Sequence, residues 1–281
     1  MSKETTMTPL KMRIGDVELI GVSDGPLKTS IDYVIGMERA EAESLVGQTD
    51  AGSFYIPVNN FVIRRGGNTI LIDAGAGSTM QPTLGKLPDN LRAAGVDPRA
   101  VTHIVLTHIH PDHANGLVDA SGQANYPNAE VLVHQTEADF WLRADAGAEP
   151  ESVARNRARA QVNFAPYRDR LRRVRDGEDI LGCTPMLAPG HTPGHTCWRI
   201  ELGKSAMLAW GDVVHFAAIQ VSHPDTAVTY DLDKDLARRS RRRVLDMVAT
   251  DRLAVAGAHL SQPGFGYIVR RGSSYAFEAA S

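Results

Sequence analysis

Short apolar runs rich in valine and isoleucine recur along this chain, with turn-forming residues between them. Runs of this length, bounded by glycine, proline or asparagine, are typical of β-strands. They span residues 12–25, 59–75, 101–107, 129–135, 198–212, 252–259 and 267–278. Two of the runs are expected to contain hairpins, because Gly66-Gly67 and Gly203-Lys204 separate their apolar halves.

Helical patterns lie between several of these runs. We predict helices over residues 82–95, 135–146 and 232–251, and the first closes on Gly95, which suits a helix C-cap. The span from Ala144 to Asp176 has the least regular pattern. Both halves of the chain combine strands with helices that follow them. The pattern therefore predicts an α/β protein with two packed sheets flanked by helices.

The segment THIHPDHANG places four metal-ligand side chains in one loop, namely His108, His110, Asp112 and His113. Histidine and carboxylate are the ligands that suit zinc and its borderline neighbours. His108 and His110 are two residues apart, so they face the same side of an extended segment. Asp112 and His113 follow a predicted turn and can hold a second ion. A plain surface loop would crowd these residues for no chemical reason, so the sequence predicts a metal site.

More residues of the same type follow, each at the end of an apolar run. TPMLAPGHTPGHT carries His191 and His195, SAMLAWGDVV carries Asp212, and RLAVAGAHLS carries His259. The order HxHxDH, GHTPGH, aspartate and late histidine resembles the dinuclear hydrolases of the metallo-β-lactamase superfamily. The resemblance runs from about TILIDAGAG to GAHLSQPG. The segments ADFWL, AAIQVSHPDTAVTYDLDKD and AHLSQPGFGYI, with the two histidine motifs, are most similar to its methyl parathion hydrolase group and point also to quorum-quenching lactonases.

The resemblance implies a four-layer αββα sandwich with the metals at one edge, between the sheets. It also implies two divalent metal ions, with zinc as the expected metal. The first ion would be held by His108, His110 and His191, the second by Asp112, His113 and His259, and Asp212 would bridge them. The superfamily generally uses the first histidine of GHTPGH as a ligand, so His195 is expected to lie behind the ligands. Asp73 matches an aspartate that braces the metal loop, although it also suits a turn.

Two ions about 3.5–4 Å apart can share a water and lower its pKa from 15.7 toward roughly 7. The expected nucleophile is therefore a bridging hydroxide, with Asp112 and Asp212 as catalytic residues that offset the ionic charge and orient it. A serine triad is poorly supported because no GxSxG occurs. His215 stands where the lactonases carry a tyrosine and the parathion hydrolases an apolar residue. It is expected to donate to the oxyanion or to the leaving group, and the alternative is an ordinary polar residue at a strand end.

The expected substrate is a small lactone or carboxylic ester. An organophosphate triester is the alternative that the parathion hydrolase resemblance favours, and a thioester of the glyoxalase II type is a further one. Di-iron redox proteins share the scaffold but usually carry a flavodoxin-like domain, which is not visible here. Trp141, Phe216 and Phe265 are candidates for an apolar wall of the substrate pocket, since each adjoins a ligand segment. Plain core packing is the alternative for each aromatic residue.

The 281 residues, 43% of them hydrophobic, are enough for a sizeable core. No linker or low-complexity tract divides the chain, and the candidate ligands spread from His108 to His259, so we expect one domain over residues 1–281. The net charge of −3 argues against a nucleic-acid or membrane-surface binder. No apolar stretch approaches the roughly 20 residues that a bilayer requires, and no export signal is evident, so we expect a cytoplasmic protein.

The two cysteines, the arginine-rich spans and one apolar segment carry three further expectations. Cys183 and Cys197 are expected to be reduced and buried rather than paired. The arginine-rich spans 143–175 and 238–243 are expected to be solvated helix faces, and the alternative is an arginine of the first span that pairs with an anionic substrate. Similarity to the parathion hydrolase group implies a homodimer, for which the segment SFYIPVNNFVI offers three contact residues: Phe54, Tyr55 and Ile56.

Overall fold

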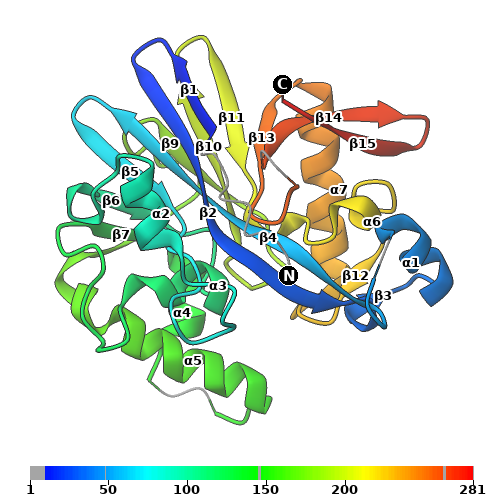
Figure 1. Cartoon of the computed structure of the whole chain (residues 1–281), viewed down its shortest axis with the longest axis horizontal. Coiled ribbons are helices and arrows are strands. Elements are labelled where there is room, and N and C mark those ends of the chain that lie inside the picture. The colour runs from blue at the N-terminus through cyan, green and yellow to red at the C-terminus, as the bar shows by residue number, and fades with distance from the viewer. Residues whose placement is uncertain (1–9, 48, 145–146, 262–263, 281) are drawn as a thin grey trace.

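The computed structural model describes residues 10–47, 49–144, 147–261 and 264–280, and two β-sheets form its centre (Figure 1). The first sheet, in spatial order, consists of β1 (Leu10–Ile14), β2 (Val17–Ser30), β4 (Ser53–Arg65), β5 (Asn68–Ile72), β6 (His103–Val105), β7 (Glu130–His134) and β8 (Leu171–Val174). The second consists of β15 (Ser274–Ala279), β14 (Phe265–Arg271), β13 (Ala254–Ala256), β11 (Ser205–Ala209), β10 (Thr196–Leu202) and β9 (Cys183–Leu187). A separate ladder joins β3 (Val34–Ile35) to β12 (Ala227–Val228).

Helices and short 3₁₀ turns connect these strands. The α-helices are α1 (Arg39–Val46), α2 (Leu87–Ala93), α3 (Pro111–Ala114), α4 (Gln135–Trp141), α5 (Glu151–Phe164), α6 (Ala217–Gln220) and α7 (Lys234–Thr250). The 3₁₀ turns are η1 (Ile31–Tyr33), η2 (Pro98–Ala100), η3 (Asn115–Leu117), η4 (Ala165–Arg170) and η5 (Gly211–Val213).

Alternation along the strands sorts the apolar side chains into layers. In β4, Phe61 and Ile63 enter the core between the two sheets, while Val62 enters the core on the outer face of the first sheet. Trp198 and Ile200 of β10 contribute to the same inter-sheet core from the other side. One face of each sheet is therefore buried against the other sheet.

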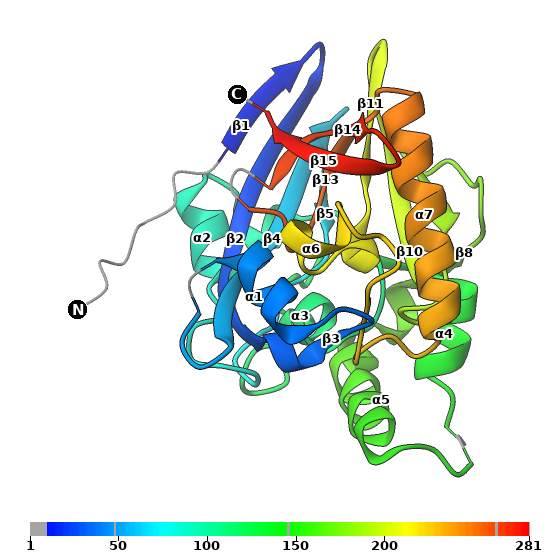
Figure 2. The same ribbon diagram turned by 90° about the vertical axis from the view of Figure 1, so that its right-hand side faces the viewer.

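Helices cover the two outer faces. On the first sheet, α2, α4 and α5 pack through side chains such as Leu91, Trp141 and Phe164. On the second sheet, α7 packs through Val244 and Leu245, and Figure 2 shows this helix along the side of the molecule. The order helix, sheet, sheet, helix confirms the predicted αββα sandwich.

The strand directions explain why chemistry gathers at one edge. β5, β6 and β7 are mutually parallel, and β11 is parallel to β13 in the other sheet. Carboxyl ends of parallel strands meet at a common edge, which is where open α/β sheets bind their ligands. The loops that follow β6, β9, β11 and β13 carry the candidate metal ligands, so side chains far apart in the sequence converge there.

Most predicted elements are present. The hairpins at Gly66-Gly67 and Gly203-Lys204 join β4 to β5 and β10 to β11, and α4 and α7 lie within the predicted helices. The first predicted helix is shorter than expected. It begins at Leu87 because Gly85, with φ of +80°, has a backbone conformation that no helix contains. Residues 145–146 of the second predicted helix lie outside the described residues.

The span over residues 144–176, whose sequence pattern is the least regular, contains the helix that was expected for its arginine-rich part. This span contains the 14-residue helix α5, the turn η4 and strand β8. Its buried positions include Val153, Arg157, Ala160 and Phe164, a spacing of four, three and four residues. Because one position of this buried stripe is an arginine, the apolar spacing typical of a helix is not evident from the sequence. Arg157 is accommodated by an ion pair with Glu149 at 2.7 Å and by the carbonyl of Phe140.

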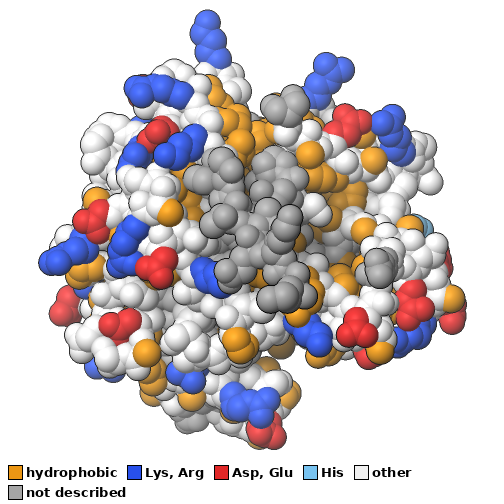
Figure 3. All heavy atoms as spheres, viewed as in Figure 1, with side chains coloured by type: hydrophobic (Ala, Val, Ile, Leu, Met, Phe, Trp, Pro, Cys, Tyr) orange, Lys and Arg blue, Asp and Glu red, His pale blue; other side chains and the backbone are white. Residues whose placement is uncertain are grey.

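Charged side chains of both signs are interspersed on the face shown in Figure 3. None of the described helices is both long and apolar enough to cross a membrane. Cys183 and Cys197 are buried free thiols, as the sequence predicted.

Candidate metal centre

The ligand loop takes its shape from Pro111. β6 ends at Val105, a loop follows in which His110 itself is extended (φ −85°, ψ 162°), and Pro111 then starts the short helix α3. Proline suits the first turn of a helix because its fixed φ is already helical and it lacks an N–H that would go unpaired. His108 and His110 therefore project from the loop before Pro111, whereas Asp112 and His113 project from a helix.

The first group of ligand atoms consists of three imidazoles and one carboxylate. His191 Nε2 lies 2.7 Å from His110 Nδ1 and 3.2 Å from His108 Nε2. Asp212 Oδ2 lies 3.3 Å from His191 Nε2 and 3.6 Å from His108 Nε2. The ligand atoms of these four residues all lie within 4.8 Å of one another.

The second group uses the other oxygen of the same aspartate. Asp212 Oδ1 lies 3.1 Å from His113 Nε2 and 3.3 Å from His259 Nε2. Asp112 Oδ2 lies 3.5 Å from each of these two nitrogens. The structure thus brings all seven predicted ligands together and places Asp212 between the two groups.

The chemistry of this donor set fits divalent metal ions. Burial, reinforced by neighbouring histidines, holds the pKa of His108 and of His110 well below the usual value, so both rings are neutral. The ring nitrogens of His110, His191 and His108, 2.7–3.2 Å apart, point toward a common position, an arrangement that a cation stabilises. Among the described residues, His113 Nε2 and Asp212 Oδ1 are buried with no hydrogen-bond partner. Such orphaned atoms are expected where an ion would be held.

Two predicted residues support the ligands from behind. Asp73 accepts hydrogen bonds from Thr107 N at 2.8 Å and from the Thr107 hydroxyl, and its Oδ2 lies 2.8 Å from His113 Nδ1. His195 Nε2 accepts from the backbone N–H of Asp212 at 2.9 Å. Their contacts are those expected of a brace and of a histidine behind the site. His103, half-buried beside Glu130, lies away from the centre.

Glu137 of α4 is a supporting residue that the sequence did not reveal. It is fully buried and joins the two histidine loops, because it accepts from Ile109 N at 2.8 Å, from the Thr192 hydroxyl at 2.7 Å and from Gly194 N at 2.9 Å. The available signal was a glutamate on the apolar face of a helix, next to Ala138 and one turn before Trp141.

His215 lies against the candidate ligands. Its Nε2 is 2.9 Å from Asp212 Oδ2, and its ring stacks on His259 with centroids 5.5 Å apart and an interplanar angle of 17°. Neither ring nitrogen has a partner in hydrogen-bond geometry among the described residues. Burial lowers the pKa of His215, so the ring is neutral and carries one proton that it can donate.

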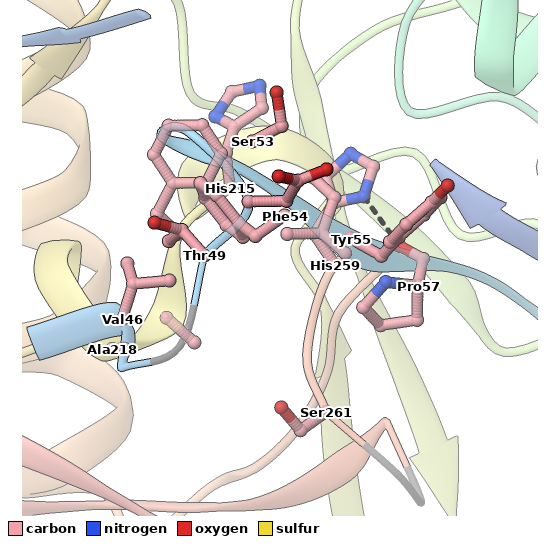
Figure 4. Close-up of a pocket in the computed structure, with 14 residues that line it drawn as sticks. Val46, Thr49, Ser53, Phe54, Tyr55, Pro57, His215, Ala218, His259 and Ser261 are labelled. Carbon is pink, nitrogen blue, oxygen red and sulfur yellow. Dashed lines mark hydrogen bonds between the residues drawn. The ribbon is translucent and has the colours of Figure 1, made fainter. Parts of the chain in front are cut away.

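Two cavities meet at this centre. One of about 450 Å³ reaches His110, Asp112, His191 and Asp212. The other, of about 460 Å³, is lined by Phe54, Phe216 and other residues (Figure 4). Three residues line both cavities: Ile56, His215 and His259. Figure 4 also shows the contact between His259 Nδ1 and the carbonyl of Pro57, at 2.8 Å.

The three aromatic candidates for the pocket wall have different positions. Trp141 lines the cavity that reaches the ligands, with its ring edge-to-face on His110 at 5.5 Å, and Phe216 lines the other cavity. The expectation for Phe265 is wrong. Phe265 pairs with Ala256 in the second sheet and is buried in the inter-sheet core, and it lines neither cavity.

Comparison with known proteins agrees with this geometry. A crystal structure described as hydrolase AbOPH in the beta lactamase superfamily matches with a TM-score of 0.94 and 29% identity, over 99% of each chain. AidC, described as a dizinc quorum-quenching lactonase in complex with a product, N-hexnoyl-L-homoserine, matches with a TM-score of 0.89 and 26% identity, over 97% of each chain. The N-acyl homoserine lactonase AttM of Azorhizobium caulinodans is 28% identical over 121 residues, which are 42% of this chain and less than half, 43%, of that relative.

The fold and the histidine and aspartate cluster define the class of protein as a metal-dependent hydrolase. The family model for the metallo-beta-lactamase superfamily matches residues 55–259. The chain belongs to that superfamily.

Proposed function

We propose that this chain holds two divalent metal ions, zinc in the first instance, and hydrolyses the ester bond of a small lactone or carboxylic ester. The observation that carries this proposal is the division of seven buried ligand residues into two groups that share one carboxylate, Asp212. One ion needs about three or four protein ligands, so seven ligands with one shared match two ions. In this proposal Asp112 and Asp212 are the catalytic carboxylates.

When bound, such ions supply a water of lowered pKa and polarise the carbonyl oxygen of the substrate. The chain's own residues do the rest. Asp212, with one oxygen facing each group, and Asp112 orient the water, and they offset the positive charge. As the acyl carbon–oxygen bond breaks, His215 passes its ring proton to the leaving oxygen and regains a proton from the attacking water. Its ring is therefore neutral before and after, and water and ester become a carboxylic acid and an alcohol. The burial of His215 excludes bulk water from that transfer.

The lining of the cavity that reaches the candidate ligands supports a neutral substrate with an apolar part. It combines Trp141, Val153, Leu27, Met80 and Tyr33 with a few hydroxyl and amide groups. Lys28 is the one lysine or arginine among its described lining residues, so no arginine of the span 143–175 lies over the pocket there. An N-acyl lactone of the kind named for AidC and AttM is a neutral molecule with an apolar arm. An organophosphate triester is also neutral and is the second candidate, whereas an anionic glutathione thioester is less well matched.

Metal analysis followed by a substrate panel tests the proposal. The purified protein should carry two equivalents of zinc when metal-replete, and it should hydrolyse acyl lactones and alkyl esters faster than aryl phosphotriesters or thioesters. Asp212→Ala should abolish turnover, because both ions and the water depend on this residue. One equivalent or none, or a near-normal kcat in Asp212→Ala, would contradict the dinuclear centre. Preference for phosphotriesters would move the second candidate to first place.

The homodimer remains a proposal, and fewer of the expected contact residues are available for it than the sequence suggested. Tyr55 is 57% exposed and is free to contact a partner. Ile56 is buried and lines both cavities, and Phe54 packs edge-to-face on Phe216 at 5.3 Å. The contact surface expected over Phe54, Tyr55 and Ile56 is therefore reduced to Tyr55.

A further inference from the structure

One arginine of the basic run on α7 is buried. The prediction that residues 238–243 form a solvated face holds for Arg239, Arg242 and Arg243, which are exposed, and is wrong for Arg241, which is 1% exposed. Arg241 belongs to the buried stripe of α7, whose members are Ala237, Ser240, Arg241, Val244, Leu245 and Val248. Burying a guanidinium is costly unless its donors are paired, so its partners show what this arginine holds in place.

The donors of Arg241 reach the segment that carries Asp212 and His215. Nε donates to the carbonyl of Val213 at 2.7 Å, and that residue directly follows Asp212 in the turn η5. One NH group donates to the carbonyls of Pro224 at 3.0 Å and Thr226 at 2.6 Å. Arg241 thus fixes the backbone on which the shared carboxylate stands.

The other NH group of Arg241 faces Asp231. It forms an ion pair with Asp231 Oδ2 at 3.8 Å, and that oxygen accepts a hydrogen bond from the backbone N–H of Val228 at 3.1 Å. The second oxygen, Oδ1, lies 3.0 Å from His191 Nδ1. Asp231 is itself 2% exposed, so water does not take the place of these partners.

This contact determines which nitrogen of His191 carries the proton. A carboxylate beside Nδ1 keeps the proton there, which leaves the lone pair on Nε2. Nε2 is the atom that faces His110, His108 and Asp212. The series of contacts from Arg241 through Asp231 to His191 therefore ends at a candidate ligand atom, His191 Nε2.

We propose that Arg241 and Asp231 are positioning residues of the metal centre. Asp231 keeps the ring proton of His191 on Nδ1 and orients that ring, and Arg241 holds Asp231 and the turn that carries Asp212 in their positions. The inference rests on the metal centre proposed above. In this inference the buried guanidinium of Arg241 aligns two ligands from different loops, His191 and Asp212.

Asp231→Asn is the sharpest test, because it preserves size. The two donors near Oδ2, from Val228 and Arg241, favour the amide oxygen on their side. The amide NH₂ then faces His191 Nδ1 and drives the ring proton to Nε2, where it opposes metal binding. Competition with a chromophoric chelator should show zinc affinity reduced about 10- to 100-fold for one of the two ions. Arg241→Met should show a loss in the same range, and the double variant no more than the larger single loss.

Arg242→Met is the matched control, since Arg242 is an exposed neighbour on the same helix that pairs with Asp225. It should bind zinc like the parent. Imidazole ¹⁵N spectra of the zinc-loaded parent should show the His191 proton on Nδ1, and Asp231→Asn should lose that signal, a change that mere loosening of the fold would not produce. If Arg241→Met fails to fold, Asp231→Asn decides. Parent-like zinc affinity in Asp231→Asn, or a retained Nδ1 proton, would overturn the inference, whereas a parent that binds no zinc would overturn the proposed function itself.

Discussion

Glu137 offers a quantitative test of how the two histidine loops are held together. The carboxylate accepts three hydrogen bonds, from Ile109 N, the Thr192 hydroxyl and Gly194 N, and the residue has no exposed surface. In Glu137→Gln the remaining oxygen can serve Thr192 and Gly194, and the new NH₂ group faces the N–H of Ile109. One buried donor then goes unpaired, which costs about 1–3 kcal/mol of unfolding free energy.

Glu137→Ala removes all three acceptor contacts. The same accounting gives a loss of about 3–9 kcal/mol, which is comparable with the whole stability of about 5–15 kcal/mol of an ordinary domain. We therefore expect Glu137→Gln to fold with a lower urea midpoint and Glu137→Ala to be unfolded or nearly so. Zinc content should fall in both, because the loops of His108 and His191 lose their common anchor.

Urea unfolding followed by circular dichroism measures these losses, provided that the denaturant dependence is unchanged. Asp139→Asn is the control on the same helix, since Asp139 makes an exposed ion pair with Arg173 and its loss should change stability by less than about 1 kcal/mol. A Glu137→Ala variant as stable as the control would refute the role assigned to this carboxylate.

Three other predictions are open to measurement. His215→Leu should lower kcat on lactones and alkyl esters about a hundred- to thousandfold and affect activated aryl phosphotriesters far less, because a good leaving group needs no proton; equal rates on every ester would remove His215 from the mechanism. Burial raises the pKa of both Cys183 and Cys197 to about 12, so iodoacetamide at pH 8 should label neither thiol in the native protein and both in urea, and fast native labelling would contradict the packing. Sedimentation should give a dimer that Tyr55→Arg weakens, whereas a mass near 30.5 kDa for the parent at micromolar concentration would exclude the dimer.

The sequence predicted the fold and the ligands where local order carries the signal. His108, His110, Asp112 and His113 stand in one loop after an apolar run, and Pro111 marks the change from strand to helix. The distant ligands were paired by resemblance to the superfamily. Spacing alone did not say that Asp212 would lie between the two groups.

Long-range polar contacts were beyond prediction from the sequence. Glu137 meets residues 28 to 57 positions away, and Asp231 meets His191 across 40 positions. Arg157 and Arg241 read as surface charges, yet each occupies a buried stripe because carbonyls and carboxylates from other segments receive it. Phe265 follows the loop of His259 closely, but the pairing of β13 with β14 turns it into the core.

The positions of the ligands predict that metal binding affects the unfolding of the protein. His108, His110, Asp112 and His113 follow a strand of the first sheet, while His191, Asp212 and His259 follow strands of the second. Bound ions would connect the two halves of the sandwich. Ions that bind only the native state raise the free energy of unfolding. Chelation should therefore lower the melting temperature and loosen amide protection first along the seam where the two sheets meet.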